Sequence, residues 1–236
     1  MRLDKFLVNT GCFTRSVAKK QVRAGCVSVN GQIPKTSDVN VDEYADKIVY
    51  CGREVVYSRY AYVMLNKPDG VVSATEDGRD KTVLDLLPPD VRTRGMFPCG
   101  RLDKNTLGLM LLTDDGELSH RLLAPKSHVA KKYRFKSKLP ISSQDAARFE
   151  GGLTLEDGYV TKPARIELDG DGLGGVITLV EGKYPQIKRM LEALDNKITY
   201  LERISFGPLT LDTTLERGEW RYLTEAEIEA LRAHAE

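Results

Sequence analysis

Residues 100–116 read GRLDKNTLGLMLLTDDG, and the chain is most informative in this stretch. Asp103 and Arg101 stand in a loop flanked by glycines, directly before an apolar run at residues 109–113 that ends in the turn residues DDG. The short length of that run and the turn behind it predict a buried strand. A loop that leads straight into a buried strand can hold a carboxylate rigidly, which makes Asp103 a candidate functional residue. Judged by its surroundings alone, an aspartate in such a loop is more often a turn or capping residue.

Strand-like segments surround this stretch. Residues 63–67 are followed by the turn signal Pro-Asp-Gly, and further strands are expected at residues 133–135, 164–168, 176–180 and 204–211. A C-terminal helix is expected after Thr224, which has Glu227 at capping-box spacing and Leu223 and Ile228 as a hydrophobic staple. Because strands predominate and helices are interspersed irregularly, the sequence predicts an α+β fold.

Residues 170–175, GDGLGG, match the pattern G-x-G-x-x-G that occurs in dinucleotide-binding sites. That pattern carries function only where it joins a strand to a helix. Here another strand-like run follows it, so we expect a hairpin loop and no nicotinamide, flavin or S-adenosylmethionine site.

The N-terminal residues predict a separate small module. A short helix is expected from Leu3 to about Gly11, and a second from Thr14 or Ser16 to Gly25 that buries residues 17, 18 and 22. A strand at residues 27–29 runs into Asn30-Gly31, a strong signal for a tight β-turn, and strands at 47–50 and 54–57 complete the module. We therefore place a first domain at residues 1–58, a linker at 59–61 and a second domain at 62–236.

Charge is distributed unevenly along the chain. The net charge is only +1, but residues 1–35 carry +6 and the remainder −5. On the second helix Arg15, Lys19 and Arg23 recur every four residues and so share one face, with Lys20 beside them. Such a face is either solvated surface or a binding surface for phosphates. Residues 118–144 also hold seven basic residues and no acid, among them Lys131 and Lys132. This stretch is either a surface that follows the RNA chain or a solvated strand edge protected by lysines.

Other classes of protein are disfavoured by composition. No apolar run approaches the roughly 18 residues that cross a bilayer, and the N-terminus has no signal-peptide pattern, so we expect a cytoplasmic protein. The four cysteines contain no C-x-x-C pair, and the three histidines have no paired-ligand spacing. We therefore expect reduced thiols and no metal site.

Two resemblances to known families give these patterns a function. Two short helices followed by Val-x-Val-Asn-Gly resemble the S-four-type RNA-binding domain, over most of residues 1–50. In that family the second helix and the adjacent loop lie on RNA phosphates, which implies the same for Arg15, Lys19, Lys20 and Arg23.

The motif G-R-L-D-x-x-T-x-G-L-x-L-L-T-x-D-G closely resembles the signature of the RsuA-type pseudouridine synthases. Three further segments agree in order, at residues 65–72, 131–133 and 186–190, and the resemblance covers residues 1–222. It implies a catalytic domain built on a mixed, largely antiparallel sheet. Among members of this group, a chain with the N-terminal domain and no long basic tail most resembles the enzyme that acts on bacterial small-subunit 16S rRNA.

The resemblance also implies roles for individual residues. Asp103 takes the position of the essential catalytic aspartate, and Tyr133 that of the tyrosine that packs on the target base. Lys188 takes the position of a basic partner of the aspartate, where arginine is commoner, with Arg189 as the alternative partner and a further RNA contact. Arg101 is suited either to fill the stack vacated by the base or to contact phosphate, or else to form a structural salt bridge.

The chemistry requires residues of these types. Isomerisation breaks the bond from ribose C1′ to N1 of uracil and rejoins the base through C5, after the base has been flipped into a pocket. One carboxylate can act as nucleophile or as charge stabiliser, at the sugar or at the base, and no cofactor is needed. We expect a monomer that acts on ribosomal RNA or a pre-ribosomal particle. The alternatives are a large-subunit 23S rRNA synthase, a non-catalytic ribosome-assembly factor that binds RNA, and an RNA methyltransferase, which would require a cofactor loop that the sequence lacks.

Overall fold

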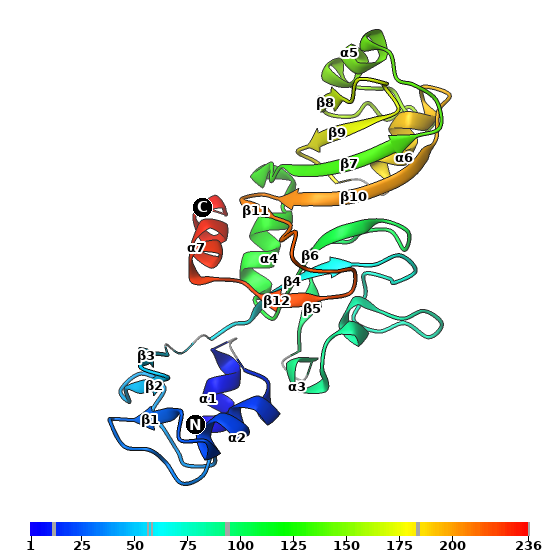
Figure 1. Cartoon of the computed structure of the whole chain (residues 1–236). Helices are drawn as coiled ribbons and strands as arrows, with labels where there is room; N and C mark the ends of the chain where they lie inside the picture. Colours follow the sequence, from blue (N-terminus) through cyan, green and yellow to red (C-terminus); the bar gives the residue numbers. More distant parts are fainter. Residues whose placement is uncertain (11–12, 56, 58, 93–94, 183–184, 236) are drawn as a thin grey trace.

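The computed structural model describes residues 1–236 except 11–12, 56, 58, 93–94, 183–184 and 236. The expected end of the first helix at Gly11, the strand position Val56 and the domain boundary at Ser58 lie outside the described residues. Figure 1 shows a small N-terminal module and a larger part built around one long sheet. None of the described helices combines the length and the apolar character needed to cross a membrane.

The N-terminal module packs two helices against a small antiparallel sheet. Its elements are α1 (Leu3–Asn9), α2 (Arg15–Arg23), β1 (Val27–Val29), β2 (Ile48–Tyr50) and β3 (Arg53–Glu54), with β2 in the middle of the sheet. Leu3, Phe6 and Ala18 belong to its own apolar core. The Thr14 hydroxyl caps α2 by accepting a hydrogen bond from the Val17 amide, and Gly25 follows the helix with φ +73°.

Three local predictions for this module have different outcomes. The tight turn is confirmed: Asn30 and Gly31 both have positive φ, and the Val29 and Gln32 backbones bond to each other across it. The expected burial of Val17 is wrong, because its side chain is 41% exposed. Ala18 and Val22 lie one helical turn apart on the buried face, and Val17 lies about 100° away around the axis. The strand expected at residues 54–57 is also shorter than predicted, since β3 ends at Glu54.

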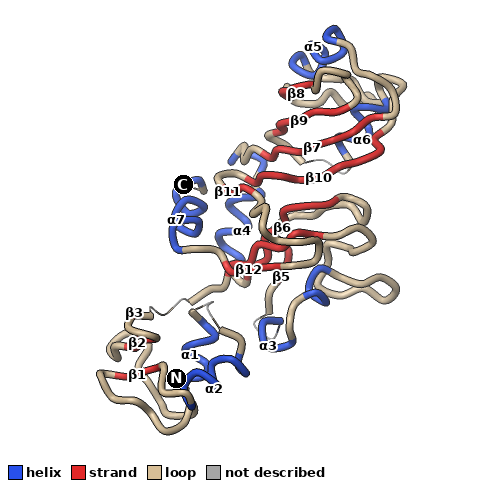
Figure 2. The backbone as a smooth tube through the Cα atoms, viewed as in Figure 1, coloured by secondary structure: helices blue, strands red, loops and turns tan. Residues whose placement is uncertain are grey.

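A mixed sheet forms the body of the second part (Figure 2). Its strands are β4 (Tyr62–Lys67), β5 (Phe97–Pro98), β6 (Leu107–Thr113), β7 (Lys131–Ser137), β8 (Arg165–Leu168), β9 (Gly174–Leu179), β10 (Ile198–Phe206), β11 (Leu209–Thr210) and β12 (Trp220–Tyr222). The order is β12-β4-β6-β10-β7-β9-β8, and every pairing is antiparallel except that of β6 with β10. The predicted α+β fold with a largely antiparallel sheet is confirmed.

Helices cover this sheet on both sides. They are η1 (Val83–Leu86), α3 (Pro89–Arg92), α4 (Gly116–Leu123), η2 (Pro125–Ser127), α5 (Ser143–Gly151), α6 (Gln186–Glu192) and α7 (Glu225–His234). Because side chains alternate along β4, Tyr62 and Met64 face the core under α4 and α7, whereas Val63 and Leu65 face the core under η1 and α3. The other half of the sheet packs on α5 and α6 through a third core.

Several predictions in this part are confirmed and two are wrong. The strands at residues 63–67 and 109–113 and the capping box of α7 are present. The hairpin expected at residues 170–175 is present as well, but its loop is residues 169–173, because Gly174 and Gly175 already belong to β9. Residues 204–211 are not one strand, because Gly207 turns the chain with φ +54° and β11 folds back on β10. Residues 114–116 do not simply form a turn. Asp115 is the N-cap of α4, because its carboxylate accepts a hydrogen bond from the Leu118 amide.

Candidate active site

The loop at residues 100–106 is held from beneath by a buried lysine. Lys67, at the end of β4, is fully buried and its ammonium donates to the carbonyls of Pro68, Lys104 and Thr106 at 3.1, 2.9 and 2.9 Å. Burial lowers the pKa of Lys67 to about 8, although Asp69 and Asp103 act in the opposite direction. Two of the three carbonyls belong to the loop, so the position of Lys67 fixes the backbone around Asp103.

A serine holds the other end of the loop. The Ser73 hydroxyl donates to the Leu102 carbonyl at 2.8 Å and accepts from the Leu102 amide at 3.0 Å. Leu102 itself is buried in the core beneath η1. The residue before Asp103 is therefore fixed by both backbone and side chain.

Gly108 lets the loop sit at the centre of the sheet. It has φ +95°, and a Cβ placed there would lie 2.3 Å from the Arg203 carbonyl oxygen of β10. Only glycine allows β6 and β10 to approach so closely at their short parallel pairing. The loop that precedes β6 therefore opens at the junction between the two halves of the sheet.

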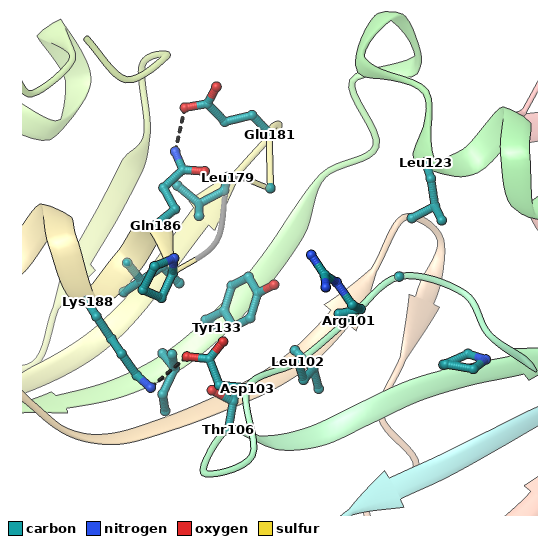
Figure 3. A pocket seen from close by; sticks show the side chains of 16 residues that line it. Arg101, Leu102, Asp103, Thr106, Leu123, Tyr133, Leu179, Glu181, Gln186 and Lys188 are labelled. Carbon is teal, nitrogen blue, oxygen red and sulfur yellow. Dashed lines mark hydrogen bonds and ion pairs between the residues drawn. The ribbon is translucent and has the colours of Figure 1, made fainter. Parts of the chain in front are cut away.

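The structure brings Asp103 and Lys188 together. The Lys188 Nζ lies 2.6 Å from the Asp103 Oδ2, and the side chains are 35% and 14% exposed. Lys188 reaches the loop from α6, and Figure 3 shows the two side chains meeting with the ring of Tyr133 beside them. The neighbouring Arg189 instead forms an ion pair with Asp157 at 2.6 Å. Of the two basic residues that the sequence offered, Lys188 is the one in contact with Asp103.

Tyr133, Arg101 and this ion pair line one cavity. The cavity has a volume of about 460 Å³, within the range typical of small-ligand sites. Leu102, Ile187 and Leu201 supply apolar wall, while Asp103 and Lys188 supply the charged groups. Arg101 is exposed and lines the cavity on the side of the Tyr133 ring that is opposite to Lys188 (Figure 3). Residues predicted from three separate segments of the sequence, at 100–116, 131–133 and 186–190, thus share one concave site.

One part of the site was not predicted from the sequence. Glu181, after β9, accepts hydrogen bonds from the Tyr159 hydroxyl, the Lys162 amide and the Gln186 side chain. Gln186 begins α6, so this carboxylate positions the helix that carries Lys188 (Figure 3). Tyr159 and Lys162 precede Glu181 by 22 and 19 residues, and Gln186 follows it by 5, so no single local motif connects the group.

The predicted RNA-contacting lysines and arginines occupy different places. Lys131 is half-buried with its ammonium on the Val129 carbonyl at 2.8 Å, whereas Lys132 is exposed on the other face of β7. Arg15, Lys19, Lys20 and Arg23 are exposed on α2. None of these four is among the described residues that line the cavity at Asp103.

Known proteins are similar to both parts of the chain. Residues 61–193 match the family described as RNA pseudouridylate synthase, and residues 1–43 match the S4 domain. An uncharacterized RNA pseudouridine synthase of Bacillus subtilis is 45% identical over 98% of each chain. The ribosomal small subunit pseudouridine synthase A of Vibrio cholerae is 40% identical over 98% of this chain and 99% of its own.

A solved structure agrees as well. The crystal structure of a pseudouridylate synthase, 38% identical in sequence, matches with a TM-score of 0.69 and covers 98% of this chain and 99% of that one. Since the family match takes in more than half of the chain and the relatives align over nearly all of it, the chain belongs to the RNA pseudouridylate synthase family, as a member of the RsuA type with an N-terminal S4 domain.

Proposed function

We propose that this pseudouridine synthase converts one uridine of small-subunit 16S rRNA to pseudouridine, with Asp103 as the catalytic carboxylate. The observation that carries the proposal is the Asp103–Lys188 ion pair at 2.6 Å inside the cavity beside Tyr133. The choice of subunit rests on the name of the Vibrio cholerae relative. Ribosomal RNA or a pre-ribosomal particle is then the substrate.

Each group has a task in this reaction. The target base leaves the RNA stack and enters the cavity, where the Tyr133 ring packs on the uracil face. While the bond between C1′ and N1 breaks, Asp103 acts as nucleophile or charge stabiliser, at the sugar or at the base, and Lys188 holds its carboxylate in place through the ion pair. Substrate and product have the same atoms, so the reaction consumes no second substrate.

The first experiment tests the carboxylate. Purified protein is mixed with 16S rRNA or with small-subunit particles, with nothing else added, and pseudouridine is measured by mass spectrometry. We expect the wild type to form pseudouridine and Asp103→Asn to lose at least 1000-fold in turnover. The matched control is Asp80→Asn, which removes an aspartate that pairs with Lys104 at 2.7 Å outside the cavity and should keep nearly full activity.

The second experiment tests the target. Pseudouridine is mapped in ribosomal RNA from cells with and without the protein. Loss of one modified site in 16S rRNA supports the proposal, and loss of a site in 23S rRNA moves the target to the large subunit. If no modified site is lost and neither RNA nor particles are modified in vitro, the chain acts as a non-catalytic RNA-binding factor.

A further inference from the structure

A second cavity adjoins the one that contains Asp103. Its volume is about 330 Å³, and it shares Gly100, Arg101, Tyr133 and Glu181 with the first. Beyond this common wall it is lined by the side chains of Lys131, Lys162, Arg203 and Phe206. Arg101 and Tyr133 therefore line both of these adjoining cavities, and the reaction proposed above uses only the first.

Arg203 is a buried cation without a carboxylate. It is only 2% exposed. Its Nε donates to the Leu109 carbonyl at 2.7 Å, and its Nη2 donates to the Met110 sulfur at 3.8 Å. Across the described part of the chain no ion pair to Arg203 is formed. A buried guanidinium that lacks an anionic partner is unfavourable, because burial removes the water that would solvate its charge.

Lys131 brings a second cation to the same place. Its Nζ lies 5.7 Å from the ring centroid of Phe206, and the guanidinium carbon of Arg203 lies 5.2 Å from the same centroid. Burial, and then the nearby charge of Arg203, lower the pKa of Lys131 to about 8. The one opposing influence comes from the Cys99 thiol, so no carboxylate compensates this pair of like charges.

The remaining charges of the cavity do not balance the pair. Its described lining contains four cationic side chains, those of Arg101, Lys131, Lys162 and Arg203, and a single carboxylate, that of Glu181. Glu181 already accepts three hydrogen bonds, from Tyr159, Lys162 and Gln186. The cavity thus has an excess of positive charge and the donors to bind an anion.

We infer that this second cavity is a phosphate subsite, which binds a phosphodiester group of the RNA chain next to the uridine held in the first cavity. The buried Arg203 and the half-buried Lys131 provide donors to the phosphate oxygens, and Lys162 provides a third cation at the wall. The inference rests on the proposed function, since it places base and phosphate of one RNA segment in two cavities that share Tyr133 and Arg101. Binding of the phosphate would fix the segment before the base reacts.

The pKa of Lys131 reports on this subsite directly. Lysine side chains of the full-length protein are labelled with ¹³C, the Lys131 signal is assigned from its loss in Lys131→Met, and its pKa is measured by NMR titration. Hexauridylate and inorganic phosphate should each raise that pKa by about one unit, since a bound anion favours the ammonium form. The nucleoside uridine, which lacks phosphate, should leave it unchanged. A response to inorganic phosphate but none to hexauridylate would assign the cavity to a free anion and overturn the RNA assignment.

RNA affinity supplies the second measurement. With 16S rRNA, Lys131→Met should bind about tenfold more weakly and show a salt dependence that is shallower by about 0.7 in log–log slope, as expected for one lost phosphate contact. The matched control is Lys197→Met, which removes an exposed lysine directly before Ile198, the first residue of β10. Equal affinity and slope for the two variants would overturn the subsite. Wild-type pseudouridine formation is measured separately, so an active enzyme with an unresponsive Lys131 would refute this inference while leaving the proposed function intact.

Discussion

The partner of Asp103 in the structure is a lysine and not an arginine. An ammonium presents a point charge to the carboxylate, whereas a guanidinium binds it through two parallel N–H groups. The observed contact joins one oxygen, Asp103 Oδ2, to Lys188 Nζ at 2.6 Å. The site therefore depends on the positive charge at position 188 and not on the forked geometry of arginine.

The first prediction concerns this charge. Lys188→Arg should keep turnover within about tenfold of the wild type, because a cation still faces Asp103. Lys188→Met should lower kcat by about 100-fold, because the carboxylate loses the group that holds it in place. Single-turnover kinetics on 16S rRNA measure both. Equal losses in the two variants would show that α6 needs lysine for a reason other than charge.

The second prediction concerns the buried lysine under the loop. Lys67→Met removes the ammonium that donates to three carbonyls, of which that of Lys104 keeps a second hydrogen bond from the Gly70 amide. It should reduce the free energy of unfolding by about 3 kcal/mol and lower kcat about tenfold. Urea denaturation and turnover provide the two readouts. Lys104→Met serves as control, since it removes only a half-exposed ion pair with Asp80 and should cost at most about 1 kcal/mol. A Lys67→Met protein as stable and active as the control would mean that the remaining bonds to the loop, such as those from Ser73 and Gly70, are sufficient to hold it.

The sequence could predict the residues that share a motif and could not predict those that support them. Asp103, Tyr133 and Lys188 stand in segments that resemble a known family, and the structure brings the three into one cavity. Lys67 also lies in such a segment, but its contacts to the loop span 37 and 39 residues and follow only from the pairing of β4 with β6. Arg203 had no local signal at all, because its environment is created by three strands that are distant in the sequence.

At the scale of elements, prediction succeeded where periodicity and caps are strong. The strand segments of β4 and β6, each followed by turn residues, and the capping box of α7 are encoded within a few neighbouring residues. The prediction of one strand at residues 204–211 was wrong because it followed the strand-forming residues on both sides and overlooked Gly207-Pro208 between them, a pair typical of turns. Which end of this segment pairs with β7 and which folds back is decided by tertiary contacts.

The C-terminal elements are joined by a charge network that yields a pH prediction. Arg221 of β12 pairs with Asp212 at 2.6 Å and with Glu227 of α7 at 2.8 Å. Hydrogen bonds from Thr214, together with Arg221, lower the pKa of Asp212 to about 2. Since the unfolded chain titrates near the ordinary value, the native state binds this proton less readily, and the stabilisation is present above about pH 4 and lost as the pH falls toward 2.

Asp212→Asn should therefore be less stable than the wild type at pH 7, and the difference should shrink steadily between about pH 4 and pH 2. Chemical denaturation followed by circular dichroism at each pH measures it. Glu150→Gln, at an exposed position of α5 without an ion pair among those described, controls for the loss of one negative charge. A difference that stayed constant down to pH 2 would place the effect in packing instead of in the charge network.

At the scale of the whole molecule, charge and chemistry occupy different modules. The basic N-terminal residues belong to the S4 domain, and the cavity with Asp103 lies in the large sheet. Arg15, Lys19 and Arg23 are exposed along α2, whereas its other face, with Ala18 and Val22, is buried in the core of the module. This arrangement suits a module that binds RNA phosphates without taking part in the reaction.

Lys19→Glu combined with Arg23→Glu should accordingly weaken binding to 16S rRNA by about 10-fold or more and make its salt dependence shallower. Both effects are expected because the variant loses about two phosphate contacts. Once RNA is saturating, kcat should change little, because neither residue lines the cavity at Asp103. The double variant Lys5→Glu with Lys35→Glu makes the same charge change at exposed positions outside α2 and is the control. Filter binding over a range of salt concentrations and turnover at saturating RNA separate the two effects. Equal weakening in both double variants would make the interaction a property of the total charge of the S4 domain, and a large fall in kcat would mean that α2 also orients the RNA for reaction.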